Sequence, residues 1–263
     1  MHHMLRGAVM ITVLCATLST GCGRSDMASN ETQEDKSSLS PLSMAAKRGD
    51  VSVVRKLLTA RADPNGPDSE GNTPLHYAVS SGKIAVVETL LAGGANVRAC
   101  SRSGYTALHA VAVDRQVRIA ELLLAAGADI NARTDDNVTP LLASVGSPYS
   151  DSKMSLTLIR AGADVNIADS DGRTALWLCS QVCEELLKRG ADPNIKARAL
   201  GFPGYTPLHM AAMNGYTEKV KLLLQSGADP SIRNDTGETP LDITNVKFAE
   251  VRELLTHSIK GKY

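Results

Sequence analysis

Three histidines share one local setting: His76, His109 and His209 each follow a threonine by three residues. Neutral imidazole is the commonest metal ligand among protein side chains, so a recurring histidine raises the question of a zinc site. Equivalent residues on stacked helices lie about 8–10 Å apart, whereas a zinc–nitrogen bond is about 2 Å long. The three imidazoles therefore cannot share one ion. We predict that they hydrogen-bond helix N-termini and the loops between repeats, and we predict no metal site.

The cysteines define no disulfide framework. Apart from Cys15 and Cys22 near the N-terminus, the chain has Cys100, Cys179 and Cys183, an odd number. Cys179 and Cys183 flank a short turn, and a bridge between them would be compatible with an oxidising compartment. Our preferred interpretation is that both are small buried packing residues.

No short catalytic motif is present. The sequence contains no HExxH, GxxxxGK[ST], GxSxG or Rossmann glycine pattern. We therefore predict no catalytic residue and no cofactor, and an enzyme with an unrecognised site is the alternative of another class. The 28 basic and 28 acidic residues cancel, so no overall positive field would hold a nucleic-acid backbone or an anionic membrane.

The segments that position these residues form a sequence repeat. The stretch TPLHYA at residues 73–78 returns five times in related form, and its threonines are spaced by 33, 33, 35, 32 and 33 residues. These threonines are Thr73, Thr106, Thr139, Thr174, Thr206 and Thr239. A fixed period near 33 predicts stacked structural repeats.

Each repeat predicts two short helices. The Thr73 hydroxyl can cap the first helix, and Pro74 fits its first position, where the missing N–H is harmless. After Gly82, the apolar run at residues 84–92 predicts the second helix. Gly94 follows it, where a left-handed residue ends a helix.

The stretches GNTPLHYAVSSGKIAVVETLLAGGANV and GYTPLHMAAMNGYTEKVKLLLQSGADP closely resemble the ankyrin repeat. The resemblance implies an all-α fold, an ankyrin-repeat solenoid of paired antiparallel helices with hairpin fingers. We assign residues 39–263 to this domain, as five full repeats with degenerate N- and C-terminal caps.

Several units depart from the period. The fourth full unit is five residues shorter than the first between its threonine and the alanine after its second helix, while the next finger gains four residues. This predicts a clipped helix pair beside an enlarged finger. Trp177 replaces the histidine there, and we favour a packing role for it over contact with a partner. Arg61 replaces the terminal glycine of the first unit, so we expect an altered turn. Pro148, in an insertion of the third unit, favours a loop.

The N-terminus predicts export. Arg6, the apolar run at residues 8–18 and the ending STGC have the order of a signal peptide over residues 1–22. The ending resembles a bacterial lipoprotein signal, which implies lipidation of Cys22, although Ser19 stands where leucine is usual. Residues 23–38 are polar and predict a flexible tether. We expect a membrane-anchored lipoprotein of the bacterial periplasm, with plain secretion or a short uncleaved anchor as alternatives.

The family resemblance implies a non-catalytic module that binds another protein on an extended concave face, formed by fingertips and the exposed sides of the first helices. Placing the pattern on this sequence selects as partner-binding residues Arg102, Tyr105, Asp135, Asp136, Arg173, Phe202, Tyr205, Met213 and Asn214. Aromatic residues and arginine are enriched among interface hot spots. The expected role is that of a scaffold or protective binder, with an immunity-type inhibitor of a toxin as the alternative. We expect no nucleic-acid partner, and membrane contact only through the lipid anchor.

Overall fold

A computed structural model of the 263-residue chain describes residues 39–146 and 152–261. Within these ranges the chain forms helices and loops without a β-strand, which confirms the all-α prediction. The signal peptide, Cys22, the tether and Pro148 lie outside the described residues. No helix in the described ranges is long and apolar enough to cross a membrane.

The described residues divide into two compact units, one of residues 39–134 with Gly146 and one of residues 135–145 and 152–261. The first unit contains α2 (Pro41–Arg48), α3 (Val51–Thr59), α4 (Pro74–Ser81), α5 (Ile84–Ala92), α6 (Ala107–Asp114) and α7 (Val117–Ala125). The second contains α8 (Pro140–Gly146), α9 (Ser152–Arg160), α10 (Ala175–Leu178), α11 (Cys183–Lys188), α12 (Pro207–Asn214), α13 (Thr217–Gln225), α14 (Pro240–Ile243) and α15 (Ala249–Ile259).

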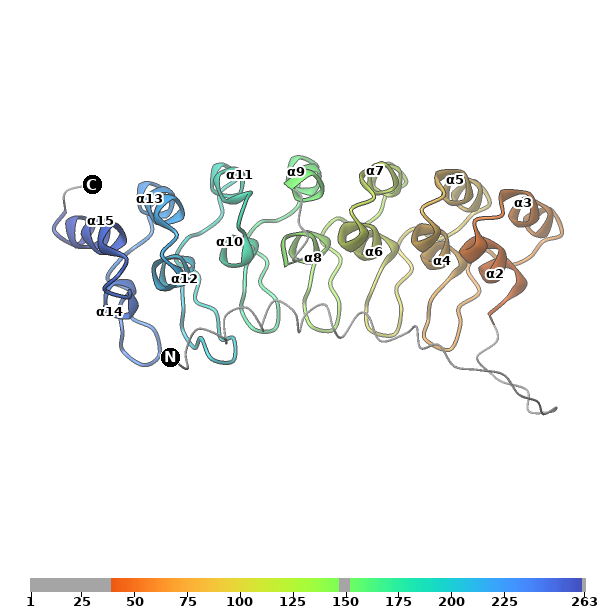
Figure 1. Cartoon of the computed structure of the whole chain (residues 1–263). Helices are drawn as coiled ribbons and strands as arrows, with labels where there is room; N and C mark the ends of the chain where they lie inside the picture. Colours follow the sequence, from red (N-terminus) through yellow and green to blue (C-terminus); the bar gives the residue numbers. More distant parts are fainter. Residues whose placement is uncertain (1–38, 147–151, 262–263) are drawn as a thin grey trace. The chain divides into compact units, whose positions relative to one another are not determined.

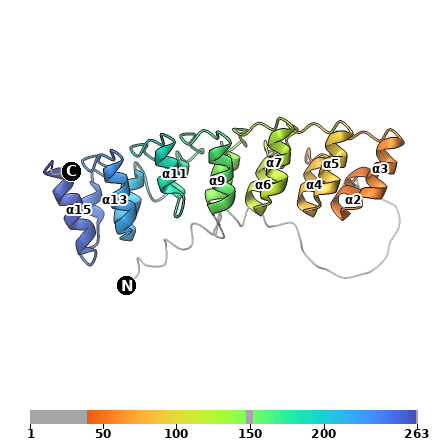
Figure 2. The same ribbon diagram turned by 90° about the horizontal axis from the view of Figure 1, so that it is seen from above.

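Within each unit the helices alternate between two rows. In Figure 1 the second helix of each pair, such as α5 or α13, lies in the upper row, and the first helix, such as α4 or α12, lies below it. Seen from above, neighbouring second helices of a unit run side by side (Figure 2). The finger loops project from the first-helix row, away from the second helices (Figure 1).

The first helices begin as the sequence predicts. Pro74 and Pro207 occupy the start of α4 and α12, and Thr73 and Thr206 precede them in extended conformation. The Thr206 N–H donates to Nδ1 of His209 at 3.2 Å, so the histidine satisfies a backbone donor at the helix start. His76 and His109 make the same bond with the N–H of their threonines. The predicted structural role of these histidines is confirmed.

The core of both units is aliphatic. Leu75 and Leu108 in the first unit, and Leu176 and Leu208 in the second, are at most 1% exposed. Small buried alanines such as Ala211 let successive first helices approach closely. A chain with 3% aromatic residues builds its core in this way.

The turn after the first repeat contradicts our expectation. Arg61 adopts φ 60°, in the same left-handed region as Gly94 at 87°. Its N–H bonds the Leu58 carbonyl, and the Ala62 N–H bonds the Leu57 carbonyl, each at 3.0 Å. Gly94 and the residue after it make the equivalent bonds. The turn is therefore not altered, and the arginine accepts the left-handed conformation to keep both bonds.

Asparagine side chains tie successive repeats together. The Asn194 side-chain amide donates to the Gly227 carbonyl at 3.2 Å, and its oxygen accepts from the Asp229 N–H at 2.8 Å. Asn166 bonds Gly190 and Asp192 in the same way. Each asparagine satisfies the backbone just past the next second helix, which fixes the spacing between fingers.

Candidate functional site

The most distinctive part of the second unit is the clipped pair α10–α11 and the finger that follows it. α10 has four residues and α11 has six, whereas α12 and α13 have eight and nine. The finger at residues 197–205 closes through Ala197, whose N–H donates to the Tyr205 carbonyl at 2.8 Å. The Gly204 N–H bonds the Ala197 carbonyl at 2.8 Å. Both the clipped helices and the enlarged finger were predicted, and both are confirmed.

Four rings form a continuous contact path along this finger, which we call the aromatic row: Trp177, Phe202, Tyr205 and His209. Trp177 of α10 meets Phe202 edge-on, with ring centroids 6.2 Å apart. Phe202 meets Tyr205 edge-on at 5.4 Å, and Tyr205 lies 5.3 Å from His209 of α12. The Trp177 ring contacts Phe202, as the favoured packing role predicts. Edge-to-face contacts at these distances stabilise a fixed arrangement of rings.

The finger that carries Phe202 and Tyr205 also has an exposed apolar tip. Leu200 is 85% exposed, the highest value among the large apolar side chains of the described residues. Trp177, Phe202 and Tyr205 are half-buried, and His209 is buried. An exposed leucine beside preordered aromatic side chains is a surface that gains free energy when another molecule covers it.

Trp177 replaces a histidine whose two nitrogens are both used elsewhere. Nε2 of His76 lies 3.1 Å from the Tyr105 carbonyl, and Nε2 of His209 lies 3.1 Å from the Glu238 carbonyl. Since Nδ1 accepts from the threonine N–H, Nε2 must carry the proton and donate. The Trp177 indole Nε1 has no hydrogen-bond partner in the described structure, although the atom is buried. The replacement exchanges a capping side chain for an aromatic one with an unsatisfied donor.

The row is uncharged at neutral pH. Burial lowers the pKa of His209, an effect that the Glu238 carbonyl partly opposes by favouring the protonated ring. Burial raises the pKa of Tyr205, and the nearby Glu238 carboxylate raises it further. Both imidazole nitrogens of His209 already bond backbone groups, so this histidine is not placed to shuttle a proton.

Two charged finger residues, Arg173 and Arg198, differ in their surroundings. Nε of Arg173 lies 2.8 Å from a carboxylate oxygen of the buried Asp169, and Nη2 lies 3.1 Å from Asp171. Arg198 is exposed, and its side chain makes no ion pair within the described ranges. Its guanidinium is therefore available at the base of the enlarged finger.

The nine residues predicted for partner binding differ in accessibility. Arg102, Asp135, Asp136 and Asn214 are exposed, and Tyr105, Arg173, Phe202, Tyr205 and Met213 are half-buried. Among the nine, the printed ring contacts bring Phe202 and Tyr205 together. Tyr105 stacks on His109 at 5.2 Å, and burial raises its pKa, so its phenol is less available than the sequence suggests.

The structure joins Cys179 and Cys183 in a disulfide across the clipped turn. Both cysteines are buried, as predicted, but they are not separate packing residues, and this corrects our preferred interpretation. The turn between them is only three residues long, which brings the end of α10 to the start of α11. Cys100 is free and exposed.

Sequence reasoning missed Lys219. Its Nζ donates to the Cys179 carbonyl at 2.7 Å, and burial lowers its pKa from 10.5 to about 8. The equivalent positions of other second helices hold buried apolar residues, including Val86, Ile119 and Met154. Aligning the second helices would have revealed this lysine as an exception facing the clipped repeat.

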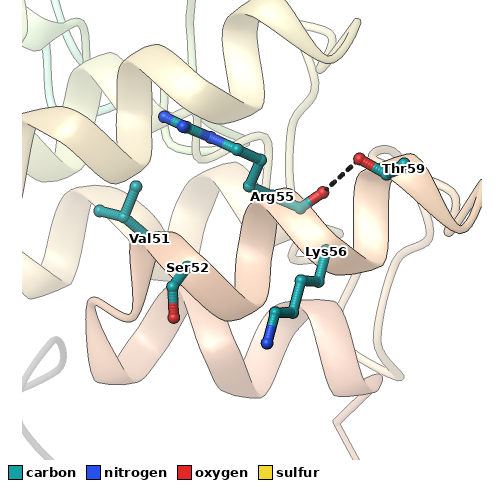
Figure 3. Close-up of a pocket in the computed structure, with 5 residues that line it drawn as sticks. All are labelled: Val51, Ser52, Arg55, Lys56 and Thr59. Atoms are coloured by element: carbon teal, nitrogen blue, oxygen red, sulfur yellow. Dashed lines mark hydrogen bonds between the residues drawn. The ribbon is translucent and has the colours of Figure 1, made fainter.

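The described structure contains no assembled catalytic or metal site that we can identify. No group of three or more histidine, cysteine or acidic residues in the described ranges could hold a metal ion. A surface hollow of about 590 Å³ runs along α3, and its lining residues are Val51, Ser52, Arg55, Lys56 and Thr59. Arg55 and Lys56 extend to opposite sides of the helix (Figure 3). A hollow lined by two cations and no carboxylate does not form an acid–base pair.

The family comparison covers most of the chain. A family model described as ankyrin repeats in three copies matches residues 14–101, 42–134, 86–169, 147–234 and 180–260 in overlapping stretches. Ankyrin repeat and SOCS box protein 16 of Mus musculus is 37% identical over 97 residues, which are 32% of this chain and 20% of that protein. Protein phosphatase 1 regulatory subunit 27 of Homo sapiens is 38% identical over 69 residues, or 26% of this chain and 42% of that protein. This chain thus spans less than half of either relative.

Two solved structures have the same fold. The ankyrin repeat domain of Bcl-3 superposes with a TM-score of 0.71 at 28% identity, covering 82% of this chain and 98% of that one. The ankyrin repeat domain of human ASB11 gives a TM-score of 0.66 at 23% identity, covering 84% and 98%. The comparisons therefore agree with the arrangement of helix pairs and fingers in each unit.

Proposed function

Because this chain belongs to the ankyrin-repeat family, whose repeats are protein-interaction modules, we propose that it is a non-catalytic binding protein and that its partner docks on the aromatic row and Leu200. The observation that carries the proposal is an enlarged finger that holds an 85% exposed leucine and two half-buried rings, the first of which contacts Trp177 of α10. Interface hot spots are typically aromatic residues that are already ordered before binding.

The other predicted residues extend this surface within the second unit. Met213 and Asn214 lie at the end of α12, the helix that begins beside Tyr205. Asp135 and Asp136 are exposed ahead of α8. In the first unit Arg102 is an exposed finger cation, and its backbone N–H donates to the Glu70 carbonyl at 2.8 Å. We assign the second-unit residues to the rim of the interface, where charges affect association rate and selectivity more than affinity.

The enzyme alternative has weaker support. In the described ranges the buried histidines bond backbone groups, and the enlarged finger of the second unit exposes an apolar side chain, Leu200. Ankyrin repeats are typically binding modules without an active site. The arrangement of the aromatic row fits recognition better than acid–base chemistry.

We further propose that the protein acts in the bacterial envelope, anchored by a lipid at Cys22 or secreted. This part of the proposal rests on the order of charged, apolar and small residues at positions 1–22. Two roles fit it: a scaffold or protective binder of an envelope protein, and an immunity-type inhibitor that covers a toxin. Replacing Cys22 with alanine should move the protein from the membrane fraction to the soluble fraction if the lipid anchor exists.

The binding surface is tested with one pair of variants of the full chain. Leu200→Ala combined with Phe202→Ala removes the fingertip and the middle ring, whereas Arg102→Ala, in the first unit, is the matched control. Proteins captured by the wild type are identified by mass spectrometry and then purified, and their affinity for each variant is measured by calorimetry. We expect the double variant to bind at least about tenfold more weakly and Arg102→Ala to lose less than about threefold.

The control measurement is thermal unfolding of each variant. If the double variant keeps both its melting temperature and its affinity for the captured protein, the aromatic row is not the interface. A captured protein that turns over a substrate only in the presence of this chain would instead favour a regulatory or enzymatic role.

A further inference from the structure

The one-turn helix α10 carries Trp177 and keeps its threonine cap, but it lacks the histidine cap and the left-handed glycine turn of α12. A single helical turn is unfavourable by itself, because nucleation fixes several residues for one hydrogen bond. In α12, Gly215 ends the helix with φ 72°, and its N–H bonds the carbonyls of Ala211 and Ala212. In α10, Cys179 occupies that position in extended conformation, with φ −65° and ψ 143°. The left-handed turn that normally closes a first helix is absent here.

A second one-turn helix shows which restraints are missing. α14 also has four residues, but Asp242 completes a capping box with Thr239 at its start. At its end, the Arg252 guanidinium donates to the carbonyls of Leu241 and Thr244 at 3.2 and 2.9 Å. α14 therefore has its backbone satisfied at both ends without any covalent link.

α10 has only part of this support. Trp177 cannot accept the threonine N–H as a histidine or aspartate does, because an indole is a donor only. Lys219 supplies one hydrogen bond at the C-terminal end, to the Cys179 carbonyl. At the start the Thr174 hydroxyl accepts the Trp177 N–H at 3.4 Å, and Ala175 and Leu176 are buried in the core. At the C-terminal end the disulfide from Cys179 to Cys183 ties α10 to the first residue of α11.

Trp177 lies two residues before Cys179 and contacts Phe202 through its ring edge. We propose that the Cys179–Cys183 disulfide is a redox-controlled clasp of the aromatic row, so that its reduction releases the α10–α11 turn and separates Trp177 from Phe202. The clasp is a property of the row itself and does not depend on the identity of a partner. It adds to the proposed function that the binding surface exists in two states, selected by the redox conditions around the protein.

The proposed reduction uses a dithiol as the reductant. One thiolate of the dithiol attacks a cysteine sulfur, which breaks the Cys179–Cys183 bond, forms a mixed disulfide and releases the other cysteine as a thiolate. The second thiol of the reductant then displaces the remaining cysteine and closes the reductant's own disulfide. Two electrons and two protons pass from the dithiol to the two cysteines. Ser180 and Gln181, between the cysteines, are exposed, whereas both cysteines are buried, so a reductant reaches a sulfur only when the turn opens.

The chain carries its own reporter, because Trp177 is its only tryptophan. We would record the fluorescence of the full chain in a Cys100→Ser background, which removes the exposed thiol, before and after incubation with dithiothreitol. Alkylation and peptide mass spectrometry establish whether Cys179 and Cys183 are reduced. We expect a red shift of the emission maximum and stronger quenching by acrylamide, with no loss of helical circular dichroism. The emission position is used because a nearby disulfide also changes intensity.

Two variants distinguish the clasp from a general effect of the reductant. The double variant Cys179→Ser with Cys183→Ser should show the red-shifted spectrum without dithiothreitol and no response to it. Phe202→Ala should resemble the reduced spectrum while the disulfide is intact, since the ring contact is already lost.

Three outcomes would overturn the proposal. The first is complete reduction with an unchanged emission maximum and unchanged quenching, which would mean that Trp177 stays in place. The second is loss of the helical signal on reduction, since the bridge would then hold the fold and not a local clasp. The third is an intact thiol pair in the protein isolated under oxidising conditions. If the double serine variant fails to fold, the dithiothreitol titration of the Cys100→Ser chain still decides between these results.

Discussion

Two neighbouring helix pairs of the second unit stabilise the ends of their first helix in different ways. The complete pair α12–α13 begins with Thr206 and His209, ends its first helix at Gly215, and satisfies its backbone with side chains of the repeat motif. The clipped pair α10–α11 begins with Thr174 and keeps the threonine cap, with the Trp177 N–H donating to its hydroxyl at 3.4 Å. Its remaining support comes from a disulfide and from Lys219 of the next repeat.

Under the proposed function, the difference exchanges helix-capping groups for recognition surface. α10 is a turn shorter than α12, and Cys179 stands where α12 has Gly215. Exchanging histidine for Trp177 gives up a cap but supplies a ring that meets Phe202 on the enlarged finger. Lys219 and the disulfide stabilise the end of α10, and position 177 contributes an aromatic ring to the row.

The largest expected effect is on the complete pair. His209→Leu leaves the Thr206 N–H and the Glu238 carbonyl without their buried partner, so we expect the free energy of unfolding to fall by about 2–4 kcal/mol. Urea denaturation followed by circular dichroism measures it. His209→Asn is the graded control, since its side-chain oxygen can accept the Thr206 N–H and only the Glu238 bond is lost. A leucine variant within about 0.5 kcal/mol of the wild type would show that the histidine cap is dispensable.

The clipped pair should respond to alkaline pH through Lys219. Burial lowers the pKa of this amine from 10.5 to about 8. Because the folded pKa lies below the unfolded one, the unfolded chain holds the proton more tightly between these values, and folded stability rises with pH across that window. We expect the wild type to gain about 1–3 kcal/mol relative to Lys219→Met between pH 7.5 and pH 10.

Lys221→Met is the matched control for that comparison. Lys221 is bonded by the Glu250 and Glu218 carboxylates, which raise its pKa, so its contribution to stability is lost rather than gained as pH rises through its folded pKa. The Lys221→Met chain should therefore keep the Lys219-dependent rise. An identical pH profile for the wild type and Lys219→Met would mean that Lys219 is not buried against the Cys179 carbonyl.

The sequence predicts the complete pair far better than the clipped one, for physical reasons. Thr206 and Pro207 act on the first turn of α12 and Gly215 acts on its last turn, so these residue types alone specify where the helix begins and ends. The contact of Trp177 with Phe202 joins residues 25 positions apart and depends on how far the deletion draws α10 back. Lys219 and Cys179 are 40 positions apart, and the bond between them exists only because the shortened helix leaves a carbonyl within reach.

The site was partly predictable for the same reason. Phe202 and Tyr205 are close in sequence on one finger, and an insertion there could be counted directly. Leu200 was missed because exposure of a fingertip is not visible in a periodic pattern. Arg61 was misjudged because two backbone hydrogen bonds outweigh the modest cost of a left-handed arginine.

The smallest expected change in stability comes from restoring the motif. Trp177→His recreates the Thr-x-x-His pattern of α12, with Nδ1 placed for the Thr174 N–H and Nε2 on the side of the next finger. We expect the free energy of unfolding to stay within about 1 kcal/mol of the wild type, because the regained cap offsets the lost ring contact.

The same substitution should cost at least about tenfold in affinity for a partner captured by the wild type, since it removes one end of the aromatic row. Trp177→Phe keeps a ring beside Phe202 but neither capping nitrogen, so it should bind better than Trp177→His and be no more stable. The two variants should therefore rank in opposite order for stability and for affinity. We expect this if Trp177 replaces a capping histidine with a ring that contacts the partner. If both variants bind as the wild type does, the tryptophan serves packing alone, and the partner surface must be sought elsewhere on the fingers.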